Sequence, residues 1–286
     1  MDAIPHNLVR FESQLERAIS RERGRRWQRS ASRGRSITWL AFTLLALVVG
    51  VGLVLFWHDR TAARGTRERE APPVRQATRR TPRQPGQIFD KSQHSTTAPA
   101  SIWVVVNKQH PLDPESYVPR DLTPVGNGQY MRAEAAAALN RMLSGARQAG
   151  HAVAPDSGYR SYRYQVTVYD SEVDADGRTK ADTVSARPGY SEHQTGWAVD
   201  LGSGGCNITD CFGATPGGRW VTANAFRYGF ILRYPATKAG ITGYSGEPWH
   251  FRYVGTKLAR ELHKEHVATL EEFFNISGGA SYRVPG

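Results

Sequence analysis

The chain has 286 residues, with 37 lysines and arginines, 26 aspartates and glutamates, nine histidines and two cysteines. Two cysteines are too few for a small disulfide-stabilised scaffold, and a hydrophobic share of 40% is too high for a wholly disordered chain. The net charge of +11 is concentrated at one end: residues 1–100 contain 18 basic and 8 acidic side chains, against 19 and 18 in the remainder. Because the folded part carries no helix-turn-helix, zinc-finger or RNA-recognition motif, nucleic-acid binding is not expected.

Residues 37–57 form a stretch of 21 residues without a charged side chain. A helix of this length, rising about 1.5 Å per residue, crosses a hydrocarbon core about 30 Å thick. Trp39 and Trp57 stand near its ends, where indole rings favour the headgroup boundary. A buried core helix and a cleaved signal peptide are the alternatives, but the stretch exceeds the ~7–15 apolar residues of a signal peptide. We therefore predict a single retained transmembrane helix.

Arginines flank this predicted helix unequally. Eight lie in the 20 residues before it and five in the 20 residues after it. This bias favours a cytoplasmic N-terminus, with residues 1–36 as a basic cytoplasmic tail and the C-terminal domain outside the cytoplasmic membrane. Residues 58–100, rich in Arg, Pro and Thr, are predicted to be a flexible linker because they contain too few aliphatic side chains to form a core. Binding of this linker to an anionic polymer or to lipid headgroups is the alternative.

The folded domain is predicted to occupy residues 101–286 and to begin with a strand at Ile102, where β-branched residues follow one another. Residues 131–150 are rich in helix formers and end at a glycine, which predicts a helix, and residues 161–171 predict a second one. Residues 257–274 predict a closing helix. Short aromatic or β-branched segments predict strands within residues 151–160, 196–202, 228–234 and 248–255. An α+β domain is therefore expected.

Cys206 and Cys211 are separated by four residues in a glycine-rich loop. A pair this close, in a domain predicted to lie outside the cytoplasm, favours a small loop closed by a disulfide. Zinc binding by both thiolates is the alternative, although the chain contains no further cysteine to complete such a site.

Two short segments carry the residue types of an open metal site. In SEHQTGWAVD, His193 and Asp200 lie seven residues apart around a glycine, and EPWH ends at His250. A catalytic zinc takes three protein ligands and leaves one position for water, which two imidazoles and one carboxylate satisfy. Glu247, three residues before His250, would serve as general base. Each spacing alone is weak evidence, since packed histidines and strand-ending aspartates are common and no HExxH motif occurs.

Five segments combine into a more specific pattern. In chain order they are VVNKQHPLDPESYVPRDL, SGYRSYRYQ, PGYSEHQTGWAVDLG, NAFRYGFILRYP and EPWHFRYVG. Together they resemble the VanY-type D-alanyl-D-alanine carboxypeptidases, over about residues 101–274. These enzymes belong to the zinc peptidases that share the LAS fold with D-Ala-D-Ala dipeptidases and the Hedgehog signalling domain. The resemblance implies a small central antiparallel sheet flanked by helices.

The resemblance also implies a role for the motif residues. The family's SxHxxxxxxD motif falls on Ser191, His193 and Asp200, and its ExxH motif falls on Glu247 and His250. The implied Zn²⁺ ligands are the two histidines and the aspartate, and the implied base is Glu247. These assignments agree with those made from the residue types alone.

Further family positions map onto the second and third of these segments. Arg160, in GYRS, corresponds to an arginine near the scissile carbonyl, where a guanidinium stabilises the developing oxyanion. Gln165 and Ser191 resemble positions that hold the terminal carboxylate of the substrate. A surface arginine and an exposed helical glutamine are the alternatives. The chain departs from the family at Trp197, where a smaller aliphatic residue is expected, and in the loop over residues 202–219.

The resulting hypothesis is a membrane-anchored zinc carboxypeptidase that removes the C-terminal D-Ala from peptidoglycan stem peptides ending in D-Ala-D-Ala. A zinc-bound water would attack the peptide bond, with Glu247 as general base. The alternatives are an L,D-carboxypeptidase or a D-Ala-D-Ala dipeptidase of the same fold, and a non-catalytic module that binds the cell wall.

Overall fold

The computed structural model of the chain describes residues 89–279 and 281–283. The predicted cytoplasmic tail and the predicted transmembrane helix at residues 37–57 lie outside this part of the chain, as does most of the predicted linker. Within the described part, no helix has both the length and the hydrophobicity needed to cross a membrane. The described part begins inside the predicted linker, where Phe89 packs against Trp103 and Phe273 with ring centroids 5.6 and 5.5 Å away.

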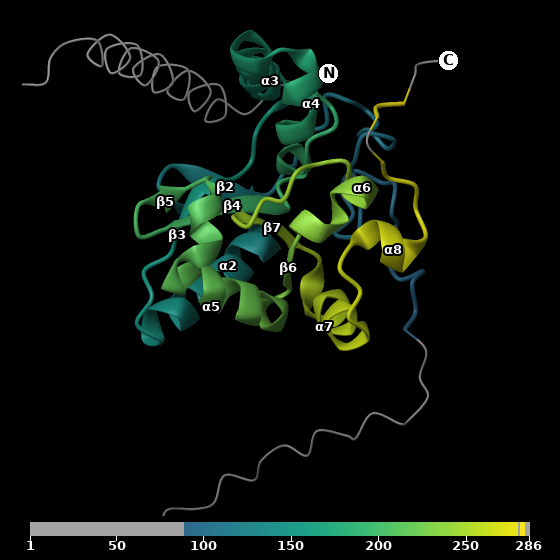
Figure 1. The fold of residues 1–286 in the computed structure, drawn as a ribbon. Helices are drawn as coiled ribbons and strands as arrows, with labels where there is room; N and C mark the ends of the chain where they lie inside the picture. The colour runs from purple at the N-terminus through teal and green to yellow at the C-terminus, as the bar shows by residue number, and fades with distance from the viewer. Residues whose placement is uncertain (1–88, 280, 284–286) are drawn as a thin grey trace, which may run out of the picture. The chain divides into compact units, whose positions relative to one another are not determined.

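An antiparallel sheet lies at the centre of the domain, as the resemblance implied (Figure 1). Its strands, in spatial order, are β3 (Ala154–Ser157), β4 (Ala198–Ser203), β7 (His250–Tyr253) and β6 (Phe230–Leu232), with the short β5 (Cys206–Asn207) paired to the end of β4. All four strands of the main path coincide with segments predicted as strands, although β4 extends one residue further than predicted. A separate hairpin of β1 (Leu122–Gly126) and β2 (Gln129–Arg132) precedes the sheet and was not predicted.

Helices lie on both sides of this sheet. They are α2 (Ala133–Gln148), α3 (Tyr162–Asp176), α4 (Arg178–Val184), α5 (Pro216–Asn224), α6 (Ala239–Thr242), α7 (Gly255–Glu265) and α8 (Leu270–Phe274). Figure 1 shows α2, α5 and α7 along one side and α3 with α4 on the other. The helices predicted at residues 131–150 and 161–171 are present as α2 and α3. The single closing helix predicted at residues 257–274 is wrong: the backbone leaves the helical region at His266, where φ is 55°, and two helices result.

Apolar and polar side chains alternate along the two central strands, so one face of the sheet packs into the core and the other is polar. Val199 and Leu201 of β4 and Phe251 of β7 are fully buried in a cluster that includes Leu139 and Met142 of α2. Burying each such side chain contributes roughly 1.5–3 kcal/mol. Because successive side chains of a strand point to opposite faces, the residues between them face away from α2.

The strand predicted at Ile102 is also wrong, since residues 101–106 form no strand. The segment is nevertheless buried, with Val104, Val105 and Val106 at most 3% exposed. Its backbone finds other partners: the carbonyls of Ile102 and Val104 both accept hydrogen bonds from Arg252 Nη2 at 3.0 Å. The β-branched residues are therefore present because the segment is buried. The guanidinium of Arg252 supplies the hydrogen bonds that a neighbouring strand would otherwise donate.

Candidate active site and family

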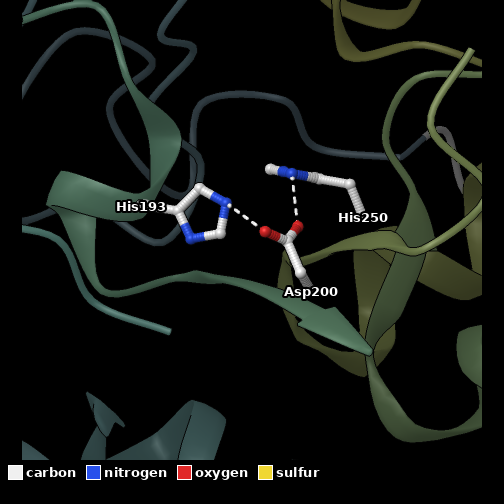
Figure 2. A group of neighbouring side chains, drawn as sticks. All are labelled: His193, Asp200 and His250. Atoms are coloured by element: carbon white, nitrogen blue, oxygen red, sulfur yellow. Dashed lines mark ion pairs between the residues drawn. The ribbon is translucent and has the colours of Figure 1, made fainter. Parts of the chain in front are cut away.

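His193, Asp200 and His250 converge on the face of the sheet turned away from α2 (Figure 2). Asp200 and His250 are direct cross-strand partners in the β4–β7 register. His193 lies on a short 3-10 helix, η1 (Glu192–Thr195), which ends at Gly196 with φ of 72°, and the chain then enters β4. One nitrogen or oxygen atom from each of the three buried side chains lies within 4.8 Å of the others. The structure thus brings together all three predicted metal ligands.

The carboxylate of Asp200 lies between the two imidazoles, with one oxygen toward each ring (Figure 2). His193 Nε2 is 3.3 Å from Asp200 Oδ2, and His250 Nδ1 is 3.1 Å from Asp200 Oδ1. His193 Nδ1 is 2.7 Å from the carbonyl oxygen of Gly158. A proton on Nδ1 donates to this carbonyl and leaves the Nε2 lone pair free, as a metal-ligating histidine requires. Burial, together with the positive charge of Arg160, lowers the pKa of His193 to about 4, so this ring is neutral at pH 7.

The surroundings of His250 are strongly anionic. Burial disfavours its charged form, but the nearby carboxylates of Asp200 and Glu192 prevail and raise the pKa of His250 to about 9 in the metal-free chain. Although burial opposes ionisation, the neighbouring histidines hold the pKa of Asp200 well below its usual range. Among the described residues, His193 Nε2 and Asp200 Oδ1 are buried without a hydrogen-bond partner. Two imidazoles and one ionised carboxylate around unsatisfied atoms fit a divalent metal ion such as zinc.

Glu247 stands next to this cluster. Its Oε2 is 3.5 Å from His250 Nδ1, and its backbone N–H donates to the carbonyl of Tyr234 at 2.9 Å. Burial raises the pKa of Glu247 to about 7, against the positive charge of His250 and with help from the negative charge of Asp200. A carboxylate with a pKa near neutrality exchanges protons efficiently with a reacting group at neutral pH. The position and the pKa both suit the predicted role of general base.

Arg160 lies close to the same cluster. Its backbone N–H donates to the carbonyl of His193 at 3.2 Å. Its positive charge helps to lower the pKa of His193 and opposes the rise that burial causes in the pKa of Glu247. Its Nε is buried and has no hydrogen-bond partner among the described residues. A guanidinium donor left unsatisfied beside the ligands is available to a substrate oxygen, and the role of Arg160 at the scissile carbonyl stays a prediction.

Gln165 and Ser191 are both buried, at 1% and 3% exposure. Gln165 lies on α3 and donates from Nε2 to the carbonyl of Ala186 at 2.8 Å, while its Oε1 has no partner among the described residues. It is therefore not an exposed helical residue. Ser191 directly precedes η1. Contact of either side chain with a substrate carboxylate stays a prediction.

Comparison with known proteins identifies the family. The family model VanY, described as D-alanyl-D-alanine carboxypeptidase, matches residues 128–256. YodJ of Bacillus subtilis (strain 168), a protein named as a carboxypeptidase, is 44% identical over 187 residues, which cover 62% of this chain and 68% of YodJ. The chain belongs to the VanY family. The predicted resemblance is confirmed, and with it the assignment of the domain to a family of peptidases.

Two solved structures of related enzymes support the fold of the VanY domain. The LD-carboxypeptidase LdcB is 43% identical, with a TM-score of 0.58 over 63% of this chain and 88% of LdcB. The vancomycin resistance D,D-pentapeptidase VanY, from a VanB-type resistance cassette, was solved as a mutant in complex with Zn(II). It is 36% identical, with a TM-score of 0.53 over 60% of this chain and 98% of that enzyme.

A buried ionic network behind the metal ligands of this VanY domain was not predicted. Glu192 Oε1 accepts from Arg233 Nε at 2.8 Å and from Arg252 Nη1 at 3.0 Å, and Arg233 also binds Glu271 through two hydrogen bonds of 2.7 and 2.9 Å. Burial opposes ionisation of Glu192, but the two arginines hold its pKa well below the usual range. The signal in the sequence was an arginine inside each of two apolar strand segments, FILRYP and PWHFRYVG.

Trp197, the departure from the expected VanY pattern, is buried directly before β4. Its ring stacks on Tyr253 with centroids 5.9 Å apart, and the guanidinium of Arg132 lies 4.4 Å from the ring centroid. The same arginine forms a 2.8 Å ion pair with Asp121. The large ring is thus enclosed by a cation and an aromatic partner and joins the hydrophobic core.

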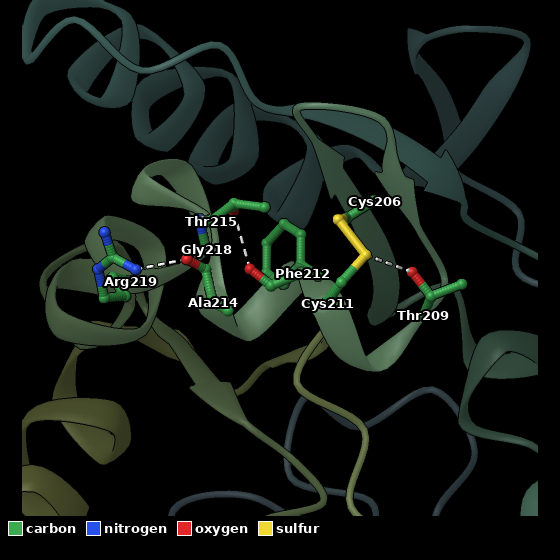
Figure 3. The surroundings of a disulfide bond; sticks show 8 residues. All are labelled: Cys206, Thr209, Cys211, Phe212, Ala214, Thr215, Gly218 and Arg219. Atoms are coloured by element: carbon green, nitrogen blue, oxygen red, sulfur yellow. Dashed lines mark hydrogen bonds between the residues drawn. A yellow bond between two sulfur atoms is a disulfide. The ribbon is translucent and has the colours of Figure 1, made fainter.

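The glycine-rich loop after β4 is closed by a Cys206–Cys211 disulfide, whose Cα atoms are 5.6 Å apart (Figure 3). The loop continues into α5, where the side chain of Thr215 caps the helix by accepting from Gly218 N at 2.8 Å. It also approaches the EPWH segment, because a Cβ atom added at Gly213 would lie 3.0 Å from Pro248 Cβ. The loop is therefore a neighbour of the segment that carries Glu247.

Proposed function

We propose that the chain is a zinc-dependent carboxypeptidase that removes the C-terminal D-Ala from peptidoglycan stem peptides ending in D-Ala-D-Ala. The observation that carries this proposal is the buried cluster of His193, Asp200 and His250 with Glu247 beside it, in a chain of the VanY family. The donor set suits zinc, and a VanY enzyme with 36% identity was solved with Zn(II). Zinc in this cluster would supply Lewis-acid chemistry, polarising the scissile carbonyl and lowering the pKa of water.

The remaining chemistry belongs to the side chains. Glu247 accepts the proton of the attacking water and returns it to the nitrogen of the departing D-Ala. Arg160 donates to the carbonyl oxygen as negative charge develops on it. Gln165 lies on α3, after Arg160, and Ser191 directly precedes η1, which carries His193. We assign both to the end of the substrate that carries the carboxylate, with the amide N–H groups of Gln165 and the hydroxyl of Ser191 as donors.

Two variants of the full-length chain test the assignment. Glu247→Ala is expected to bind one zinc per chain but to release no D-Ala, because the base is lost and the ligands remain. His193→Ala is expected to lose zinc and activity together. Zinc is measured by metal analysis and D-Ala by mass spectrometry, with and without a chelator. Full activity in either variant would refute the assigned roles.

A second candidate is an L,D-carboxypeptidase, which removes D-Ala from a tetrapeptide. It is supported by LdcB, which is more similar to this chain than the zinc-bound VanY in both identity and TM-score. Purified tetrapeptides and pentapeptides, offered separately and followed by mass, separate the two activities. Release of the intact dipeptide D-Ala-D-Ala would indicate a dipeptidase. Bound zinc without hydrolysis of any muropeptide would indicate a wall-binding module.

We further propose that residues 37–57 anchor the enzyme in the cytoplasmic membrane, with residues 1–36 inside and the catalytic domain outside. The support is the 21-residue uncharged stretch and the excess of arginines before it. The linker at residues 58–100 would then let the domain reach the peptidoglycan. In intact cells an external protease should remove the domain and leave a membrane-bound fragment. Protection of the domain, or its recovery in the soluble fraction of lysed cells, would contradict this topology.

A further inference from the structure

We propose that Glu192 is a positioning residue that sets which nitrogen of His250 is available to the metal. The inference rests on the proposed metal site and concerns a residue to which no motif gave a role. The two histidines of the cluster present different nitrogens to Asp200: His193 uses Nε2 and His250 uses Nδ1. For His193 the remaining nitrogen, Nδ1, has the carbonyl of Gly158 as its acceptor.

The remaining nitrogen of His250 faces Glu192. His250 Nε2 and Glu192 Oε2 are 3.5 Å apart, both are buried, and neither has another hydrogen-bond partner among the described residues. His250 Nε2 and Glu192 Oε2 are therefore left to interact with each other. A carboxylate oxygen can only accept, so it favours the tautomer of His250 that carries the proton on Nε2. That tautomer leaves the lone pair of Nδ1 toward Asp200 and Glu247, where the metal ligand is needed.

The two arginines hold Glu192 in the orientation that this role requires. Arg233 and Arg252 both donate to Oε1, at 2.8 and 3.0 Å, and thereby leave Oε2 for His250. Arg233 is in turn fixed by two hydrogen bonds to Glu271, and Arg252 by the carbonyls of Ile102 and Val104. The strands contribute as well, since the backbone N–H of Arg233 donates to the carbonyl of His250 at 3.2 Å.

The energetic cost of this arrangement supports a positioning role. The side chains of Glu192, Arg233 and Arg252 are all 0% exposed. Removing such charges from water costs several kcal/mol per ion, and well-packed apolar residues often stabilise a fold equally well or better. Stability alone therefore gives little reason for a carboxylate at this place. Carboxylates behind ligating histidines fix the ring and strengthen the ligand, and their loss typically weakens metal binding about 10–100-fold.

Glu192→Gln tests the inference with almost no change in volume. Its amide oxygen can still accept from both arginines, but its NH₂ then points at His250 Nε2 and favours the opposite tautomer. We expect zinc affinity, measured by competition of the full-length protein with a chromophoric chelator, to fall about 10–100-fold. Glu271→Gln is the matched control, because it removes a charge from the same arginine without facing His250. We expect it to lower thermal stability to a similar extent and to leave zinc affinity at the wild-type value.

The outcomes separate this inference from the proposed function. If the wild-type protein binds no zinc, the metal site itself is refuted. If the wild type binds zinc and Glu192→Gln binds it equally well, or if both variants lose affinity to the same extent, the positioning role is refuted. Should Glu192→Gln fail to fold, nitrogen-15 NMR of the zinc-loaded wild type decides the question. A proton on Nε2 of His250 is expected, and a proton on Nδ1 would overturn the inference.

Discussion

Replacing Gly196 by alanine should disturb the metal site through the backbone. Gly196 ends η1, three residues after His193 and four before Asp200, and its φ of 72° lies in the left-handed region. An L-residue there costs about 1–2 kcal/mol. The new Cβ would also lie 2.8 Å from Arg132 Cγ and 3.3 Å from Leu122 Cδ2, closer than ordinary packing allows. Overpacking of this kind adds about 1–3 kcal/mol.

Gly128→Ala provides a matched control for this substitution. Gly128 has a nearly identical φ of 73°, but no heavy atom lies within 4 Å of an added Cβ. The free energy of unfolding of Gly128→Ala should therefore fall only by the cost of the left-handed backbone, about 1–2 kcal/mol. That of Gly196→Ala should fall by about 2–5 kcal/mol in total. For a domain of this size each kcal/mol lowers Tm by about 2–4 °C. The difference between the two variants isolates the contact with Arg132.

The functional consequence is specific to Gly196→Ala. Arg132 is held by Asp121 and by the ring of Trp197, so the turn between the two ligands is expected to move. His193 then shifts relative to Asp200, and zinc affinity falls. Urea unfolding gives the free energies, and chelator competition gives the affinities. Equal losses of stability in the two glycine variants, with wild-type zinc affinity in both, would refute the reasoning.

Three further results are expected. Arg160→Met should lower kcat for D-Ala release about 10²–10³-fold, with a smaller effect on KM, because it removes a donor to the oxyanion. Steady-state kinetics measure both constants, and a change in KM alone would contradict this role. Replacing Cys206 and Cys211 by serine should lower the free energy of unfolding by about 2 kcal/mol, the chain-entropy value for closing so short a loop, and Tm by about 4–8 °C. An unchanged Tm would argue against the bond. The third result concerns the ion pair between Glu271 and Arg233. Burial disfavours the ionised form of Glu271, but Arg233 keeps the pKa of Glu271 below its ordinary value. This ion pair therefore stabilises the fold above the unfolded-state pKa of about 4.3, and the stabilisation is lost as the pH falls through the pKa of the folded state. Urea unfolding across acidic pH should show a shallower loss in Glu271→Gln, and identical pH profiles would be inconsistent with this account.

The metal ligands could be predicted because their arrangement is encoded locally. His193 and Asp200 share one motif, and alternation along β4 and β7 places Asp200 and His250 on the same face once the strands pair. The ionic network could not be predicted in the same way. Glu192 binds Arg233 and Arg252, which lie 41 and 60 residues later, so the pairing depends on a register that no local pattern specifies.

Two errors in the predicted secondary structure have the same physical origin. The segment at Ile102 has the composition of a strand, but its carbonyls are satisfied by Arg252, which comes 150 residues later. The closing helix breaks at His266, whose φ of 55° is uncommon for a residue other than glycine. There the backbone N–H of Val267 donates to the carbonyl of Leu262, and α8 then packs with Phe89 and Trp103. Tertiary contacts overrode local preference in both places.

The balance of buried charge explains why a divalent cation suits this site. Of the carboxylates near it, Glu192, Asp200 and Glu271 are buried and the side chain of Glu247 is 13% exposed. Two of these four, Glu192 and Glu271, are matched by the guanidiniums of Arg233 and Arg252. The other two, Asp200 and Glu247, form no hydrogen bond to a guanidinium in the described part of the chain and face the imidazoles instead. In the metal-free chain a proton on His250 offsets part of this negative charge. A divalent cation offsets it more completely, and because the proton and the metal compete for Nδ1 of His250, metal binding must release a proton.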